Sequence, residues 1–263
     1  MSGTPFRYLH HLVTVPVRAG DRHDTRFVLD SGIGLTIVSA SFAERLGLAV
    51  GPRTFSGQRM SGQEVELPLA ELPALSFGDL RRERVEVGVL DLSSFPPELR
   101  EIDGFLSLAF FDEAPFTVDY EREVVRLGAT SGGVPVDLEV ERDGPSVTVF
   151  MPLVLPGGRA VRVEVDMGSD ALILDDGLAE SVGVALDGPS VRVVDGTDET
   201  GHSYRRRFTA LRGAIHPGGA PSIKQDDPDV MFQRIRYDGL VGHAFLRRFA
   251  VTFDVPAGRI VFA

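Results

Sequence analysis

The sequence repeats itself at about half of its length, and this repeat restricts the possible folds more than any other feature. Segments of the first half of the 263 residues recur in the second, in the same order and at an offset of about 136 residues. The clearest pair is FVLDSG at 27–32 and VEVDMG at 163–168. So long a period is not that of a solenoid. The sequence therefore predicts an internal gene duplication and two domain-sized copies, at 1–130 and 131–263.

The segment between the copies supports this division. Residues 128–135 read GATSGGVP, a run of small and turn-forming residues. Such composition is typical of a linker that few contacts cross. Because both halves lie on one chain, we expect a monomer that contains an internal pseudo-dimer.

Each copy has the pattern of a mostly β domain. Short apolar runs rich in Val, Ile, Leu and Phe are bounded by Gly, Pro and Asp. Residues 12–17 are expected to pair with 25–30, and residues 147–155 with 161–166. The fold class predicted from this pattern is all-β.

One short helix is expected in each copy. FAERLGL at 42–48 matches LAESVGV at 178–184. In the first copy Ser41 and Glu44 have the spacing of a capping box, and Gly47 stands where the helix should end.

Composition excludes several kinds of chemistry. The chain has no cysteine, so disulfides, thiolate metal sites and a cysteine nucleophile are excluded. Its net charge is −11 without a basic cluster, which argues against nucleic-acid or anionic-membrane partners. The six histidines lack metal-ligand spacing, and we expect neither metal nor cofactor. The N-terminus lacks a signal-peptide pattern, and a cytoplasmic location is expected.

The repeat contains a pair of equivalent aspartates. Asp30 and Asp166 each end an apolar strand, and Gly32 and Gly168 follow two residues later. A carboxylate at the end of a buried strand needs hydrogen bonds, and the glycine lets backbone N–H groups approach it. A pseudo-twofold axis would bring the two side chains together. Two adjacent carboxyls then share a proton, so one can activate water while the other polarises a carbonyl.

These segments resemble a known family. Asp30-Ser31-Gly32, the apolar run 35–38 and the helix 42–48 resemble the active-site segment of retropepsin-like aspartic proteases. Asp238–Gly242 (DGLVG) resembles the element that precedes the last strand in that family. The resemblance implies two pseudo-twofold-related barrel lobes, each with a short helix, and a cleft covered by a flap. It also implies an aspartic endopeptidase that hydrolyses peptide or protein substrates with Asp30 and Asp166 as the catalytic pair.

Some positions depart from the family pattern. The family places a hydroxyl residue after each catalytic aspartate; Ser31 fits, but Met167 does not. Ser169 supplies a hydroxyl that could orient Asp166 instead, and Ser107 replaces a family glycine. An alternative therefore stays open, namely a catalytically inactive peptide-binding or scaffold protein with the same fold.

Two hairpins are candidates for the flap, because mobile hairpin tips need small, permissive residues. They lie at 55–64 and 194–204, and each could instead be an ordinary exposed hairpin. The candidate substrate-binding residues are Ser56, Gly57, Met60, Ser61, Gly62, Gly196 and Thr197.

Three further features are interpreted more simply. The run Arg205–Arg207 is typical of a solvated strand edge, but it could also contact an acidic substrate or the other lobe. Residues 213–237 are expected to form a long loop beside the cleft that sets specificity. Asp119 and Asp254 precede turns, where local hydrogen bonds are expected.

Overall fold

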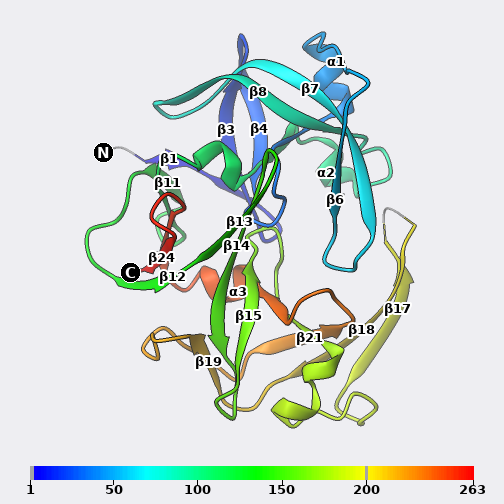
Figure 1. The fold of residues 1–263 in the computed structure, drawn as a ribbon, viewed down its shortest axis with the longest axis vertical. Coiled ribbons are helices and arrows are strands. Elements are labelled where there is room, and N and C mark those ends of the chain that lie inside the picture. Colours follow the sequence, from blue (N-terminus) through cyan, green and yellow to red (C-terminus); the bar gives the residue numbers. More distant parts are fainter. Residues whose placement is uncertain (1–2, 199–200) are drawn as a thin grey trace.

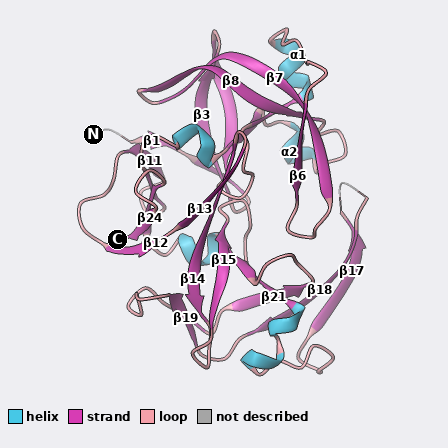
Figure 2. Ribbon diagram, in the orientation of Figure 1, coloured by secondary structure: helices cyan, strands magenta, loops and turns pink. Residues whose placement is uncertain are grey.

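The computed structural model describes residues 3–198 and 201–263. It is a mostly β molecule with two lobes and a few short helices (Figures 1 and 2), which confirms the predicted fold class. Every helix in these residues is too short or too polar to traverse a lipid bilayer.

The N-terminal lobe is built on an eight-stranded sheet in the order β2-β3-β4-β9-β5-β8-β7-β6. Its strands are β2 (Arg7–Leu9), β3 (Leu12–Ala19), β4 (Arg22–Leu29), β5 (Ile37–Ser39), β6 (Thr54–Gln58), β7 (Glu64–Phe77), β8 (Leu80–Leu90) and β9 (Gly104–Leu106). The antiparallel β3–β4 hairpin confirms the expected pairing, with Thr14 opposite Val28. A further pairing of β3 with β7 closes the sheet into a barrel.

The C-terminal lobe has the same arrangement in a ten-stranded sheet. Its strands are β13 (Glu139–Asp143), β14 (Ser146–Val154), β15 (Ala160–Val165), β16 (Leu172–Asp175), β17 (Arg192–Thr197), β18 (Ser203–Ala210), β19 (Ala214–Pro217), β20 (Gln225–Asp226), β21 (Asp229–Gln233) and β22 (Gly239–Val241). The β14–β15 hairpin confirms the second expected pairing. In the first lobe β7 pairs with both β8 and β3. In the second lobe these two pairings are divided between β18, which pairs with β21, and β19, which pairs with β14.

A six-stranded sheet joins the two lobes. It contains β1 (Thr4–Pro5), β10 (Phe116–Asp119), β11 (Val124–Leu127), β12 (Val134–Asp137), β23 (Ala250–Asp254) and β24 (Arg259–Phe262). At its centre β10 pairs with β23, and the hydroxyls of Thr117 and Thr252 lie 2.8 Å apart across the pairing. Because this sheet mixes strands of both halves, the exact division at residue 130 stays a prediction.

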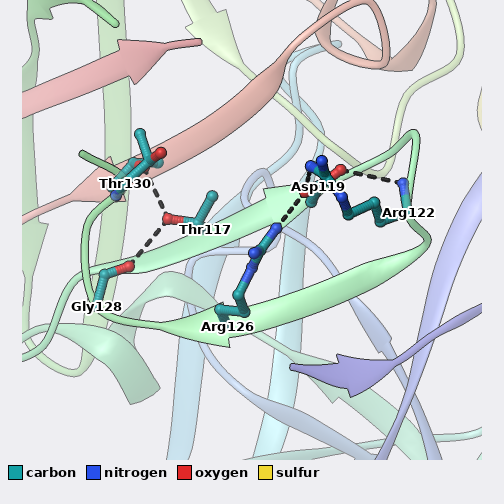
Figure 3. Close-up of polar contacts among 7 residues, drawn as sticks. Thr117, Asp119, Arg122, Arg126, Gly128 and Thr130 are labelled. Carbon is teal, nitrogen blue, oxygen red and sulfur yellow. Dashed lines mark hydrogen bonds and ion pairs between the residues drawn. The ribbon is translucent and has the colours of Figure 1, made fainter. Parts of the chain in front are cut away.

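Asp119 and Asp254 make the expected local hydrogen bonds at the turns of this sheet. Asp119 accepts bonds from the backbone and side chain of Arg122, at 3.0 and 2.9 Å, and from Arg126 (Figure 3). Asp254 accepts a bond from Arg259 Nε at 3.0 Å. Both aspartates therefore hold turns.

The helices differ from the expectation of one per lobe. Helices and 3-10 turns lie at α1 (Ala40–Arg45), α2 (Pro97–Arg100), α3 (His243–Leu246), η1 (Leu108–Phe111), η2 (Asp176–Leu178) and η3 (Glu180–Val182). The first helix is capped by Ser39, not Ser41, because the Ser39 hydroxyl accepts the Phe42 N–H. The second expected helix is split into two 3-10 turns. Gly47 follows the first helix, as predicted, and Gly183 follows the second 3-10 turn; both have positive φ.

Aromatic side chains fill the core and continue through the central sheet. Phe27 packs edge-on against Phe42 in the N-terminal lobe, and Phe116 stacks on Phe253 across the lobe boundary, with ring centroids 5.2 Å apart. Each of these side chains is buried. Complete burial of one such ring stabilises the fold by about 1.5–3 kcal/mol.

Candidate active site

Asp30 and Asp166 occupy equivalent places at the ends of β4 and β15. The backbone N–H of Asp30 donates to Leu106 O at 3.0 Å, and that of Asp166 donates to Val241 O at 3.0 Å. Each carboxylate then accepts the N–H of the glycine two residues on, Gly32 at 2.9 Å and Gly168 at 2.8 Å. The glycine turns thus supply the hydrogen bonds that these carboxyls need.

The Asp-Gly elements at 103–104 and 238–239 explain how both turns are placed. β4 lies parallel to β9, and β15 lies parallel to β22, while β9 and β22 also pair with the strand after the aspartate turn. A Cβ at Gly104 would lie 2.2 Å from Ile37 O, and one at Gly239 would lie 2.5 Å from Ile173 O. Only glycine permits this close approach of the strands.

The two carboxyl groups meet at the lobe boundary. Asp30 lies against the second glycine turn, since a Cβ at Gly168 would be 2.5 Å from its Oδ2. Asp166 lies against the first, since a Cβ at Gly32 would be 2.4 Å from its Oδ1. Each carboxyl group thus packs against the turn that carries the other. The structure therefore brings together the two residues that the repeat singled out.

Ser31 fixes the two turns to each other. Its hydroxyl donates to Val165 O at 2.7 Å and accepts the N–H of Met167 at 2.9 Å. Both partners belong to the opposite lobe, and Ser31 is buried. The reciprocal bond is missing, because the Met167 side chain has no hydroxyl. One serine therefore makes the cross-lobe contacts that the family resemblance assigns to two residues.

The other departures also have a place in the structure. Ser107 forms a hydrogen-bonded pair with Thr36, their hydroxyls 3.1 Å apart, and its backbone N–H donates to Thr36 Oγ1. The backbone N–H of Ser169 donates to the backbone carbonyl oxygen of Asp166 at 3.4 Å, whereas its hydroxyl has no hydrogen bond to the Asp166 carboxyl among the described residues. Asp170, a further carboxyl close to the second aspartate turn, is exposed.

Burial keeps protons at this site near neutral pH. It raises the pKa of Asp30 to about 8, and the charge of Asp166 adds to the effect, while the Gly32 hydrogen bond opposes it. Burial also raises the pKa of Asp166, and the next cause is the charge of Glu164. Such a shift is expected when carboxyls share a confined site.

Glu164 is a third carboxyl beside the pair, and the sequence reasoning missed it. It lies two residues before Asp166, so both side chains point to the same side of β15. Glu164 is 7% exposed, and the Tyr237 hydroxyl donates to its Oε2. Burial raises its pKa, the Tyr237 bond opposes this, and the charge of Asp30 adds to it. An acidic residue inside the apolar run VEVD was the available signal.

His11 also reaches the site without having been expected there. Its Nε2 lies 3.0 Å from the carbonyl oxygen of Gly168, on the second aspartate turn. His11 lies in the turn between β2 and β3 of the N-terminal lobe, so this contact joins the two lobes. Its charge, when protonated, acts to lower the pKa of Asp30.

The two flap candidates lie on hairpins whose tips meet (Figure 1). Arg59 at the tip of β6–β7 forms an ion pair with Asp198 at the tip of β17–β18, at 3.3 Å. Of the candidate residues, Met60, Ser61 and Gly62 lie at the first tip. Ser56 and Gly57 lie within β6, and Gly196 and Thr197 lie within β17. Residues 199–200, inside the second candidate range, lie outside the described residues.

The first tip docks on the C-terminal lobe. The N–H of Arg236 donates to Met60 O at 3.0 Å, and the Met60 side chain packs into an apolar cluster with Ile173, Met231 and Leu240. Tyr237 packs against the same cluster. The hairpin tip therefore lies close to the residues that surround the paired carboxyls.

Two cavities lie elsewhere. One of about 1340 Å³ adjoins the central sheet near Tyr120 and His243, and one of about 440 Å³ lies between the hairpins beside Ser61. Neither is lined by Asp30 or Asp166. Within the described part of the chain, no three His, Asp or Glu side chains gather as metal ligands.

Two β lobes that bring an Asp-x-Gly turn each to their boundary define the class of aspartic-protease-like proteins. Residues 15–110 match the family model described as aspartyl protease. The crystal structure of basic 7S globulin from soybean is similar with a TM-score of 0.59 and 11% identity, over 99% of this chain and 93% of that one. No curated protein matches the sequence significantly. The two-lobed fold is therefore that of aspartic-protease-like proteins, and 96 residues of the N-terminal lobe match the aspartyl protease model.

A second solved structure matches over a smaller part of the chain. It is a retropepsin-like aspartic protease from Rickettsia conorii, 15% identical, with a TM-score of 0.36. The match covers 50% of this chain and 88% of that one.

Proposed function

We propose that the protein is an aspartic endopeptidase with Asp30 and Asp166 as its catalytic pair. The observation that supports this most is the meeting of the two carboxyls, each held by a glycine N–H and each packed against the glycine turn of the other. The raised pKa of Asp30 keeps one proton on the pair at neutral pH. One carboxyl is then ionised and the other is neutral, as the chemistry requires.

In this mechanism the ionised carboxylate takes a proton from water, and the water oxygen attacks the peptide carbonyl carbon. The neutral carboxyl donates its hydrogen bond to the carbonyl oxygen as negative charge develops there. The carboxyl that took the proton from water then passes it to the peptide nitrogen, and the C–N bond breaks to give a carboxylic acid and an amine. The contacts of Ser31 keep the two turns in register during these steps.

A fluorogenic peptide library, assayed from pH 3 to pH 8, tests this function. Hydrolysis that is lost in both Asp30→Asn and Asp166→Asn supports it. Both variants must retain the wild-type circular dichroism spectrum for the comparison to count. Absence of turnover at every pH would refute it.

The absence of a hydroxyl at Met167 favours one alternative, a peptide-binding protein without catalysis. In that case the same library binds, as measured by fluorescence anisotropy, while no product forms. Asp30→Asn would then leave the affinity unchanged, because the carboxyls would have no transition state to stabilise.

A further inference from the structure

An arginine-rich cavity lies between the second hairpin and the tip of the first. Its volume is about 440 Å³, within the range of ligand sites. Ser61 contributes from the first hairpin, and Tyr204 from the second. The charged lining residues are Arg205, Arg207, Arg234, Arg236 and Asp176. Four arginines thus face one aspartate, in a chain whose net charge is −11.

Some of this positive charge is neutralised within the protein. Arg207 Nη1 lies 2.6 Å from Asp176 Oδ2, and Arg205 forms a long 3.8 Å ion pair with Asp195, both side chains being exposed. β18 pairs with β17 along all of Arg205–Arg207, but its pairing with β21 begins at Arg207. The predicted strand edge therefore applies to Arg205 and Arg206 but not to Arg207.

Arg234 and Arg236 remain available to a ligand. Both are exposed, and neither forms an ion pair or a side-chain hydrogen bond with the described residues. The segment that carries them is held in place, since Ile235 N donates to Asp175 Oδ2 at 2.9 Å and Arg236 N donates to Met60 O. A guanidinium group presents a planar fork of donors that matches a carboxylate.

A short segment of chain connects the cavity to Glu164, the third carboxyl beside the aspartate pair. Residues 213–237 were expected to form a long loop, but they contain β19, β20 and β21 and end in the segment 234–237. Tyr237, which bonds to Glu164, directly follows Arg236. At about 3.3 Å per residue, Arg234 is at most about 10 Å of extended chain away from Tyr237. One peptide could therefore contact both places.

We propose that Arg234 and Arg236 in this cavity bind an acidic side chain of a substrate peptide. The protein would then prefer substrates that carry Glu or Asp at a position away from the cleaved bond. The inference rests on the proposed function for the identity of the ligand as a peptide. Its carboxylate would replace the solvent that now surrounds the two guanidinium groups.

Binding measured in the Asp30→Asn background tests the proposal without cleavage of the ligand. The probes are two fluorescein-labelled random peptide libraries of equal length, with Glu at fixed positions in one and Gln at the same positions in the other. We expect the Glu library to bind at least about tenfold more tightly by anisotropy, as two charge-assisted contacts imply. Higher salt should reduce this preference.

The double variant Arg234→Gln/Arg236→Gln should bring the two affinities within about twofold. The matched control, Arg18→Gln/Arg22→Gln, removes two exposed arginines from β3 and β4 and should keep the preference. Equal affinity for the two libraries, no binding of either, or an unchanged preference in Arg234→Gln/Arg236→Gln overturns the proposal. Selective binding by a chain that never cleaves a peptide would refute the proposed function and leave this inference standing.

Discussion

Replacing Glu164 by Gln should move the pH range in which the carboxyl pair holds its proton. Residues i and i+2 of a strand are about 6.6 Å apart. At an effective dielectric constant of about 20, two charges at that distance interact with about 2.5 kcal/mol, close to two pKa units. Asp166 is partly exposed, so solvent reduces this, and we expect a shift of about one unit.

The direction follows from the charge that is removed. Ionised Glu164 raises the pKa of Asp166 and in turn the pH at which the pair loses its shared proton. Glu164→Gln keeps the shape and an acceptor for Tyr237 but lacks the charge. The shared proton should therefore leave at lower pH, so the alkaline limb of the kcat/KM profile should move towards acid. Glu164→Val, which copies the equivalent Val28, should move it the same way.

Two measurements check this shift. One is the pH profile of kcat/KM, and the other is a ¹³C NMR titration of the labelled carboxyl groups, which needs no turnover. Glu121→Gln removes an exposed carboxylate and serves as the control, with no shift expected. An alkaline limb that stays in place, or moves towards higher pH, would refute the assigned coupling of Glu164 to the pair.

Three further predictions concern stability, measured by urea denaturation. Folding raises the pKa of Asp30, so its ionisation lowers the free energy of unfolding as pH rises from about 4 through about 8. The free energy of unfolding of Asp30→Asn, minus that of wild type, should therefore be about 1–2 kcal/mol larger at pH 8 than at pH 4. The same difference at both pH values would contradict this. Ser31→Ala should cost about 1–3 kcal/mol through its cross-lobe bonds, against about zero for the exposed Ser190→Ala. Gly104→Ala should lower the free energy of unfolding by more than about 2 kcal/mol, because the added methyl group would overlap a carbonyl of the neighbouring strand. Gly51→Ala is the control, since its methyl group has room. Similar losses of stability in both variants would contradict this packing.

Local sequence signals predicted the hairpins and the aspartate turns well. The apolar runs before Asp30 and Asp166 and the glycines after them specify their conformation within a few residues, and the repeat supplied the contact between them. Ser39 rather than Ser41 caps the first helix because residue 39, at the end of β5, has the extended backbone conformation of an N-cap. The capping-box spacing in the sequence does not indicate this conformation. The positions of these elements could therefore be predicted, but not their exact ends.

Contacts between distant segments could not be predicted from such signals. Glu164 and Tyr237 are 73 positions apart, and nothing in either local pattern indicates the other. The meeting of Arg59 with Asp198 depends on how the two lobes are oriented, and so does the docking of Met60. The arginine cavity similarly requires β18 and the end of β21 to lie side by side.

The pairing of β10 with β23 limits how the protein can admit a peptide. Four residue pairs and a stacked aromatic pair join the lobes there, and all of them would have to separate before the lobes could move apart. Among the described residues, the first hairpin tip is held by a partly exposed ion pair to the second tip, a backbone hydrogen bond from Arg236 and the packing of the Met60 side chain, none of which belongs to the central sheet. Access should therefore come from the hairpins lifting while the lobes keep their places, so that the distance between the two aspartates stays the same whether or not a peptide is bound.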